Sequence, residues 1–203
     1  MIFSSNVSLI NAFLPIIRNV FPDRDFDKHV ERTKDRPLAS GELSLNQALV
    51  FLGLNLSCGL AVLTSLNIQC IKLGFLVMPL VVSYPLMKRM TNFPQLVLGM
   101  TFNWGALMGW TAVLGETSLY HTIPLYISGV CWTLVYDTLY GYQDRKDDLK
   151  LGLKSTSLYL GEKPQVPLSL LCGAMVAGLF TTGYTNGLSL PYYALVRALI
   201  NPK

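Results

Sequence analysis

Residues 45 to 66, LNQALVFLGLNLSCGLAVLTSL, decide the fold because they form a long run without a charged side chain. A helix rises about 1.5 Å per residue, so this run is long enough to cross the roughly 30 Å hydrocarbon core of a bilayer. Further apolar runs follow at 70 to 87, which we expect to end at Pro85, and at 94 to 114, 118 to 136 and 166 to 184. The sequence therefore predicts an all-α, multi-pass transmembrane helical bundle with about five complete spans and a partial one at 188 to 200.

The charge content excludes most other classes of protein. Of the 203 residues, 51% are hydrophobic and 14% are charged, whereas a soluble domain carries about 25% charged residues. Most of the charge lies in two segments, residues 18 to 42 and 137 to 163. This pattern argues against a disordered chain and against nucleic-acid binding.

The number of spans predicts which segments share a membrane face. Four runs separate the two charged segments, so an even number of crossings returns the chain to the same side. The connection that contains Lys88 and Arg89 follows two crossings and lies on that side as well. Most Lys and Arg residues then gather on one face, which the positive-inside rule makes the cytoplasm-like face, or the matrix face in mitochondria.

Every aspartate of the chain belongs to one of the two charged segments. In the second, Asp137, Asp144 and Asp148 fall within about 40° of one another on a helix, with Tyr140 close to the same face. In the first, Asp23 and Asp27 are one helical turn apart, and Asn19 lies one turn earlier. Two carboxylate stripes on one membrane face suit divalent cations such as Mg²⁺, which proteins bind with a few carboxylates and substrate phosphates.

The aspartates also allow three other interpretations. The two charged segments could be ordinary connections that orient the spans. They could belong to an intramembrane ion pathway, but the carboxylates cluster at the edges of loops and not within spans. A calcium loop over Asp23 to Lys34 fails because Lys28 and Lys34 stand where such a loop requires Gly and Glu. Spacing alone leaves the ordinary connection and the Mg²⁺–diphosphate site both open.

Three blocks of sequence resemble the UbiA superfamily of intramembrane aromatic prenyltransferases, and most closely its 4-hydroxybenzoate polyprenyltransferase branch. They are PDRDFDKHVERTKDRPLASG (22 to 41), YPLMKRMTNFPQLVLGMTFNWGALMGW (84 to 110) and YDTLYGYQDRKDDLKLGLKSTSLYLGE (136 to 162). The last is similar to the family pattern D-x-x-Y-x-x-Q-D-x-x-D-D followed by G-x-K-S-T. The resemblance implies Mg²⁺-dependent transfer of a polyprenyl group from polyprenyl diphosphate to the ring of 4-hydroxybenzoate in ubiquinone biosynthesis.

The resemblance also implies roles for individual residues. The catalytic, metal-dependent set is Asp23, Asp27, Asp137, Asp144 and Asp148, with Asn19 as a further candidate metal ligand. The candidate diphosphate contacts are Lys88, Lys154, Arg36 and Arg145. Asn103 and Tyr140 are expected at the aromatic substrate or cavity, and Asn103 has an interhelical hydrogen bond as its structural alternative.

We expect a single transmembrane prenyltransferase domain over 1–203 that is shorter than the family at both ends. It consists of a divergent N-terminus (1–21), a first Asp loop (22–41), the apolar spans and a second Asp loop (137–163). By resemblance it lies in the mitochondrial inner membrane, with its Asp loops in the matrix and other ubiquinone-biosynthesis proteins as partners. The alternatives are a related enzyme with another aromatic acceptor, and an inactive membrane protein that binds prenyl diphosphate.

Overall fold

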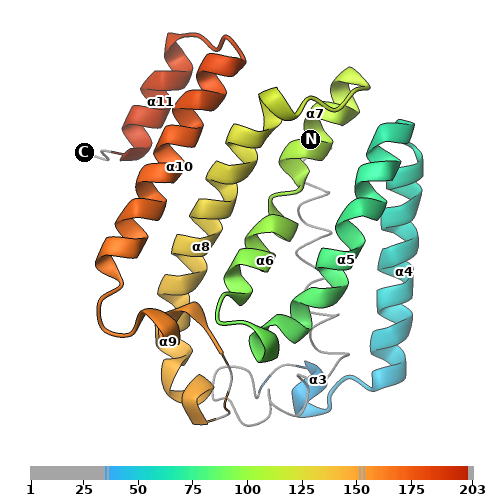
Figure 1. Cartoon of the computed structure of the whole chain (residues 1–203). Coiled ribbons are helices and arrows are strands. Elements are labelled where there is room, and N and C mark those ends of the chain that lie inside the picture. The colour runs from blue at the N-terminus through green and yellow to red at the C-terminus, as the bar shows by residue number, and fades with distance from the viewer. Residues whose placement is uncertain (1–34, 36, 151, 153, 201–203) are drawn as a thin grey trace.

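The computed structural model describes residues 35, 37–150, 152 and 154–200, and all regular structure in these residues is helical. The helices are α3 (Pro37–Ser40), α4 (Leu45–Thr64), α5 (Ile68–Met90), α6 (Pro94–Phe102), α7 (Gly105–Leu114), α8 (Leu119–Lys150), α9 (Thr156–Leu160), α10 (Gln165–Thr185) and α11 (Leu190–Ile200). The long helices run side by side and alternate in direction, with α8 between α6 and α10 (Figure 1).

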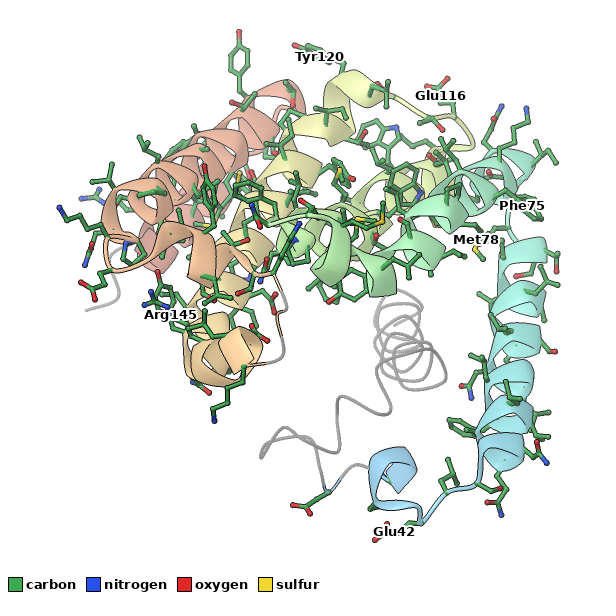
Figure 2. The ribbon with its side chains drawn as sticks, turned by 60° about the horizontal axis from the view of Figure 1, so that its bottom comes forward. Glu42, Phe75, Met78, Glu116, Tyr120 and Arg145 are labelled. Atoms are coloured by element: carbon green, nitrogen blue, oxygen red, sulfur yellow. The ribbon has the colours of Figure 1, made fainter. Side chains whose placement is uncertain are left out.

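The ends of the helices divide into two groups. The α5–α6 connection, the end of α8, α9 and the start of α4 lie at one end of the bundle (Figure 1). The α4–α5, α7–α8 and α10–α11 connections lie at the other. Glu42 and Arg145 occupy the first end, and Glu116 and Tyr120 occupy the second (Figure 2). The described parts of the two charged segments therefore share one end of the molecule, as the count of spans predicts.

Short polar signals set the helix limits. The Ser44 side chain accepts a hydrogen bond from the backbone N–H of Gln47, whose side chain accepts one from the Ser44 N–H, so α4 begins with a capping box. Asn67 caps α5 and also donates from Nδ2 to the Thr111 carbonyl at 2.7 Å, which ties this turn to α7. Gly115, with φ +78°, ends α7 in the left-handed conformation that glycine tolerates.

Two predicted boundaries are wrong. The span expected to end at Pro85 continues as α5 to Met90; a proline removes a single backbone donor, and the neighbouring turns keep their hydrogen bonds. The region from Asp137 to Lys150, predicted as part of a loop, is the continuation of α8. Its charges mark where the helix leaves the apolar region, not where it stops.

Side-chain polarity in the bundle is reversed relative to a soluble protein. Buried side chains include many Ser and Thr residues, whereas the surface carries many large apolar side chains; Phe75 at 64% exposure is one example on α5 (Figure 2). By length and composition, the segments Asn46–Thr64, Pro94–Leu114 and Gln165–Thr185 are helices able to cross a membrane. A polar, small-residue interior and an apolar exterior are what a bilayer requires.

Close helix contacts depend on small residues. A Cβ atom at Gly99 of α6 would lie 3.3 Å from the Val130 carbonyl oxygen of α8. At Gly178 of α10 it would lie 2.9 Å from the carbonyl oxygen of Pro124, and Ser128 Oγ donates across the same contact to the Met175 carbonyl at 3.0 Å. These contacts hold α8 against α6 and α10 and fix the helix that carries the second set of aspartates.

Candidate active site on α8

A row of aromatic and acidic residues runs along α8. Trp132, Tyr136 and Tyr140 are four residues apart, each about half exposed, with ring centroids 6.2 Å apart for the first pair and 4.6 Å for the second. Asp144 and Asp148 occupy the next two positions of this i, i+4 row. Each step of four residues turns about 40° around the helix, so the series leads from half-exposed aromatic positions to the buried Asp148 near the end of α8 at Lys150.

The acidic end of this row is partly enclosed. Asp148 is 6% exposed, and Asp137 is half-buried. For Asp144 the structure describes the position within α8 only. A carboxylate that is removed from water is stabilised by a counter-charge or by hydrogen bonds.

The spacing along α8 determines which aspartates can share one metal ion. Asp144 and Asp148 are one turn apart, about 6 Å along the axis, whereas Asp137 lies about 10 Å before Asp144. By backbone spacing alone, Asp144 and Asp148 are close enough to share one ion, and Asp137 is farther along the helix. Among the side chains that the structure describes, no three metal-ligating groups come together; that set excludes Asp144 and residues 1–34.

Basic residues at this end of the bundle differ in their surroundings. The Arg145 guanidinium lies over the ring of Tyr142, 5.9 Å from its centroid, and the Tyr142 hydroxyl donates to the Gly161 carbonyl at 2.8 Å. Arg145 lies near the end of α8 (Figure 2). Lys154 is exposed on the connection that leads into α9. Arg145 therefore lies between Asp144 and Asp148 on α8, and Lys154 lies on the connection that follows the helix.

The residues after Lys154 are fastened to the rest of the bundle. Ser155, Thr156 and Ser157 are 2%, 6% and 0% exposed. Ser157 Oγ donates to the Gly141 carbonyl of α8 at 3.0 Å, and Thr156 Oγ1 donates to Gln95 Oε1 of α6 at 2.6 Å. These hydroxyls are directed into the protein and are not available to a ligand.

Asn103 makes the interhelical hydrogen bond that the sequence allows as its structural alternative. Its Nδ2 donates to Thr133 Oγ1 of α8 at 2.9 Å and to the Gly99 carbonyl at 2.8 Å. A role for Asn103 toward an aromatic substrate stays a prediction. The nearby Trp104 donates from Nε1 to the Leu73 carbonyl at 3.0 Å, so that side chain fastens α7 to α5.

Several predicted site residues lie outside what the structure describes. They are Asn19, Asp23, Asp27 and Arg36. Lys88 belongs to α5, two residues before its end at Met90, and this end of α5 lies at the same end of the bundle as α9 (Figure 1). The structure thus places Asp137, Tyr140, Arg145 and Asp148 on the second half of α8 and Lys154 on the connection that follows. The roles of these residues toward a substrate stay predictions.

Three residues of this region were not predicted from the sequence. Trp132 and Tyr136 precede Tyr140 on α8 at steps of four residues. This spacing, visible in the sequence, indicates that neighbouring rings of the series contact each other on a helix. Gln95 is a buried polar residue next to Pro94 at the start of α6. Its partner Thr156 is 61 residues away, and no local pattern indicates that pairing.

The chain matches the UbiA prenyltransferase family over residues 4–201 and belongs to it. The predicted family and the all-α bundle of the UbiA type are confirmed. Enzymes of this family are generally metal-dependent.

Curated relatives are named "4-hydroxybenzoate polyprenyltransferase, mitochondrial". The protein of Drosophila pseudoobscura pseudoobscura is 56% identical over 174 residues, 86% of this chain and 44% of that protein. The rat protein is 54% identical over 87% of this chain and 47% of its own length, and the human protein is 49% identical over 87% and 48%. The chain spans about half the length of these relatives.

A solved structure has the same architecture. The apo structure of a UbiA homolog from Aeropyrum pernix K1 matches with a TM-score of 0.81 and 26% sequence identity. The match covers 96% of this chain and 74% of that one. The arrangement of helices in Figure 1 is therefore that of a known intramembrane prenyltransferase fold.

Proposed function

We propose that the chain transfers a polyprenyl group from polyprenyl diphosphate to the ring of 4-hydroxybenzoate in ubiquinone biosynthesis. The observation that carries the proposal is the acidic end of α8, where Asp137, Asp144 and Asp148 fall on one side of the helix by their spacing. Carboxylates at the end of an apolar helix suit a substrate with a hydrocarbon chain and a metal-bound diphosphate head. The 49–56% identity to proteins named for this activity supports the choice of substrates.

The metal of the proposed site is Mg²⁺, and the residues present fit it. Aspartate provides the oxygen ligands that Mg²⁺ prefers, and Asp144 with Asp148 are spaced for one ion at the end of α8. Asp137 belongs to the same side of the proposed site, and Asp23 and Asp27, with Asn19 as a further candidate, would hold the diphosphate through Mg²⁺ from the other side. When bound, Mg²⁺ supplies positive charge that stabilises the departing diphosphate.

The basic residues would bind the diphosphate oxygens directly. Lys154 is exposed beside the acidic end of α8, and Lys88, Arg36 and Arg145 are the other candidates. Lysine and arginine donate charge-assisted hydrogen bonds to phosphate oxygens. These contacts would hold the reactive allylic carbon in place and stabilise the negative charge that develops on the leaving group.

Transfer then requires the carbon–oxygen bond to the diphosphate to break, a carbon–carbon bond to the ring to form, and a ring proton to leave. The bond between the allylic carbon and the diphosphate oxygen breaks, the ring carbon ortho to the phenol hydroxyl attacks the allylic cation, and that ring carbon loses its proton. Tyr136 and Tyr140 present aromatic rings that would stabilise a nearby cation. The surrounding apolar helices would exclude water, which otherwise quenches the cation.

The proposed location is the mitochondrial inner membrane, with the aspartate-bearing end in the matrix. Its support is the word "mitochondrial" in the names of the relatives and the concentration of basic residues in the same segments as the aspartates. The lipid bilayer is the solvent of the polyprenyl chain. Other ubiquinone-biosynthesis proteins are the proposed partners because they would supply or consume these membrane-bound molecules.

Product identification tests this function and its competitors. The purified chain in lipid is given Mg²⁺, a polyprenyl diphosphate and one acceptor at a time: 4-hydroxybenzoate, homogentisate or a dihydroxynaphthoate. Mass spectrometry is expected to find the prenylated ring with 4-hydroxybenzoate only. A product with another acceptor alone would reassign the substrate, and retention of labelled prenyl diphosphate without any product would replace transfer by binding.

A further inference from the structure

The connection between α8 and α9 is held by hydrogen bonds that the proposed chemistry does not use. Thr156 donates from Oγ1 to Gln95 Oε1 at 2.6 Å and from its backbone N–H to the same oxygen at 3.3 Å. Both residues are buried, Gln95 at 4% exposure and Thr156 at 6%. This pair joins the start of α9 to the first turn of α6, two elements that lie far apart in the chain.

Further hydrogen bonds join the start of α9 to a third element, α8. Ser157 Oγ donates to the Gly141 carbonyl of α8 at 3.0 Å, and a Cβ atom at Gly141 would lie 3.2 Å from the same Oγ. Ser155 Oγ caps α9 by accepting from the Leu158 N–H. The start of α9 is therefore fixed relative to both α6 and α8, at the end of the bundle where α8 carries its aspartates (Figure 1).

Lys154 directly precedes this junction, and its side chain is exposed. We propose that Thr156 and Gln95 are positioning residues, whose hydrogen bond holds the backbone of Lys154 where its ammonium group meets the diphosphate of the substrate. The inference rests on the proposed function, since that function assigns a diphosphate to Lys154. An unanchored connection would have to be ordered when the ligand binds, at a cost in conformational entropy.

The test measures the dissociation constant of geranyl diphosphate for the full chain in phospholipid nanodiscs, with Mg²⁺ present. Thr156→Val removes the hydroxyl donor with little change of shape, and Thr156→Ser keeps it. We expect Thr156→Val to raise the dissociation constant about threefold to tenfold, the range for one lost hydrogen bond, and Thr156→Ser to restore it. Hydrogen exchange of the backbone over 154–160 is expected to rise in Thr156→Val only.

A double-mutant cycle separates positioning from general stability. If Thr156 acts through Lys154, Thr156→Val adds nothing to the loss caused by Lys154→Ala. Ser128→Ala is the matched control, because it removes a buried hydroxyl that donates to the Met175 carbonyl between α8 and α10, away from this junction. That variant is expected to bind geranyl diphosphate as the original chain does.

The results distinguish the positioning role of Thr156 from the proposed function. An unchanged dissociation constant in Thr156→Val, or a full further loss in the Lys154→Ala background, overturns the positioning role and leaves the proposed function intact. Failure of the original chain to bind geranyl diphosphate overturns both. If Thr156→Val does not fold, Gln95→Met replaces it in the double-mutant cycle. Gln95→Met removes the acceptor of the same hydrogen bond, and the expected result is the same.

Discussion

The Nδ2 atom of Asn103 lies 2.9 Å from Oγ1 of Thr133 and joins the end of α6 to the middle of α8. Thr133 in turn donates to the Gly129 carbonyl at 3.0 Å, and a Cβ atom at Gly129 would overlap the Asn103 side chain. Within the hydrocarbon region such polar contacts between helices have no competition from water. This contact positions α8, whose far end carries the proposed metal site.

Replacing Thr133 by Val is expected to lower the free energy of unfolding by about 1 kcal/mol, because it leaves the part-buried Asn103 amide without one acceptor. Thr133→Ser keeps the hydroxyl and is expected to lose much less. The measurement is the thermal midpoint of the purified chain in lipid–detergent micelles. Equal midpoints for Thr133→Val and Thr133→Ser would show that this hydrogen bond contributes nothing.

Two glycines of α10 are expected to respond oppositely to alanine. At Gly178 a Cβ atom would lie 2.9 Å from the Pro124 carbonyl oxygen, whereas Gly173 has nothing within 4 Å. Gly178→Ala should therefore separate α10 from α8 and destabilise the bundle by about 1–3 kcal/mol. Gly173→Ala should be neutral or slightly stabilising because alanine favours the helix. Thermal midpoints compare the two, and a similar loss in both would contradict the close α8–α10 contact.

The two-ended arrangement in Figure 2 predicts a labelling pattern in sealed vesicles. In the double variant Glu42→Cys/Glu116→Cys, an impermeant maleimide should reach one thiol per molecule from outside, whichever way the chain is inserted. In Glu42→Cys/Lys154→Cys, both thiols share an end, so each molecule should carry two labels or none. Intact-mass spectrometry counts the labels.

The unsubstituted chain is the labelling control, since its four cysteines lie within α4, α5, α8 and α10. Detergent should give two labels in both double variants. Two external labels on single molecules of Glu42→Cys/Glu116→Cys would contradict a membrane lying between these ends.

The sequence predicted the helices well because long uncharged runs have few alternatives to a membrane helix. The segments expected at 45 to 66, 94 to 114 and 166 to 184 correspond to α4, to α6 with α7, and to α10. The apolar span expected to end at residue 136 continues as α8 to Lys150, which agrees with the helical stripe that the spacing of the aspartates predicts. Residues 137–150 contain no proline and a single glycine, Gly141, and such a segment continues a helix readily.

The candidate site was only partly predictable. The periodicity of Asp137, Asp144 and Asp148 indicated one stripe, since helix geometry alone relates their positions. Contacts between distant segments, such as Gln95 with Thr156, depend on how α6 and α9 pack. Nothing local at either residue encodes that packing, and only the assembled bundle brings the two together.

The central claim is that the acidic end of α8 binds the diphosphate through Mg²⁺, and the rate of prenyl transfer to 4-hydroxybenzoate tests it most directly. The chain in lipid should turn over with Mg²⁺, stop with EDTA and recover when Mg²⁺ is restored. Asp144→Asn should lower the rate by at least about 100-fold, while Glu116→Gln at the opposite end should not change it. Full turnover by Asp144→Asn, or in EDTA, would contradict the account.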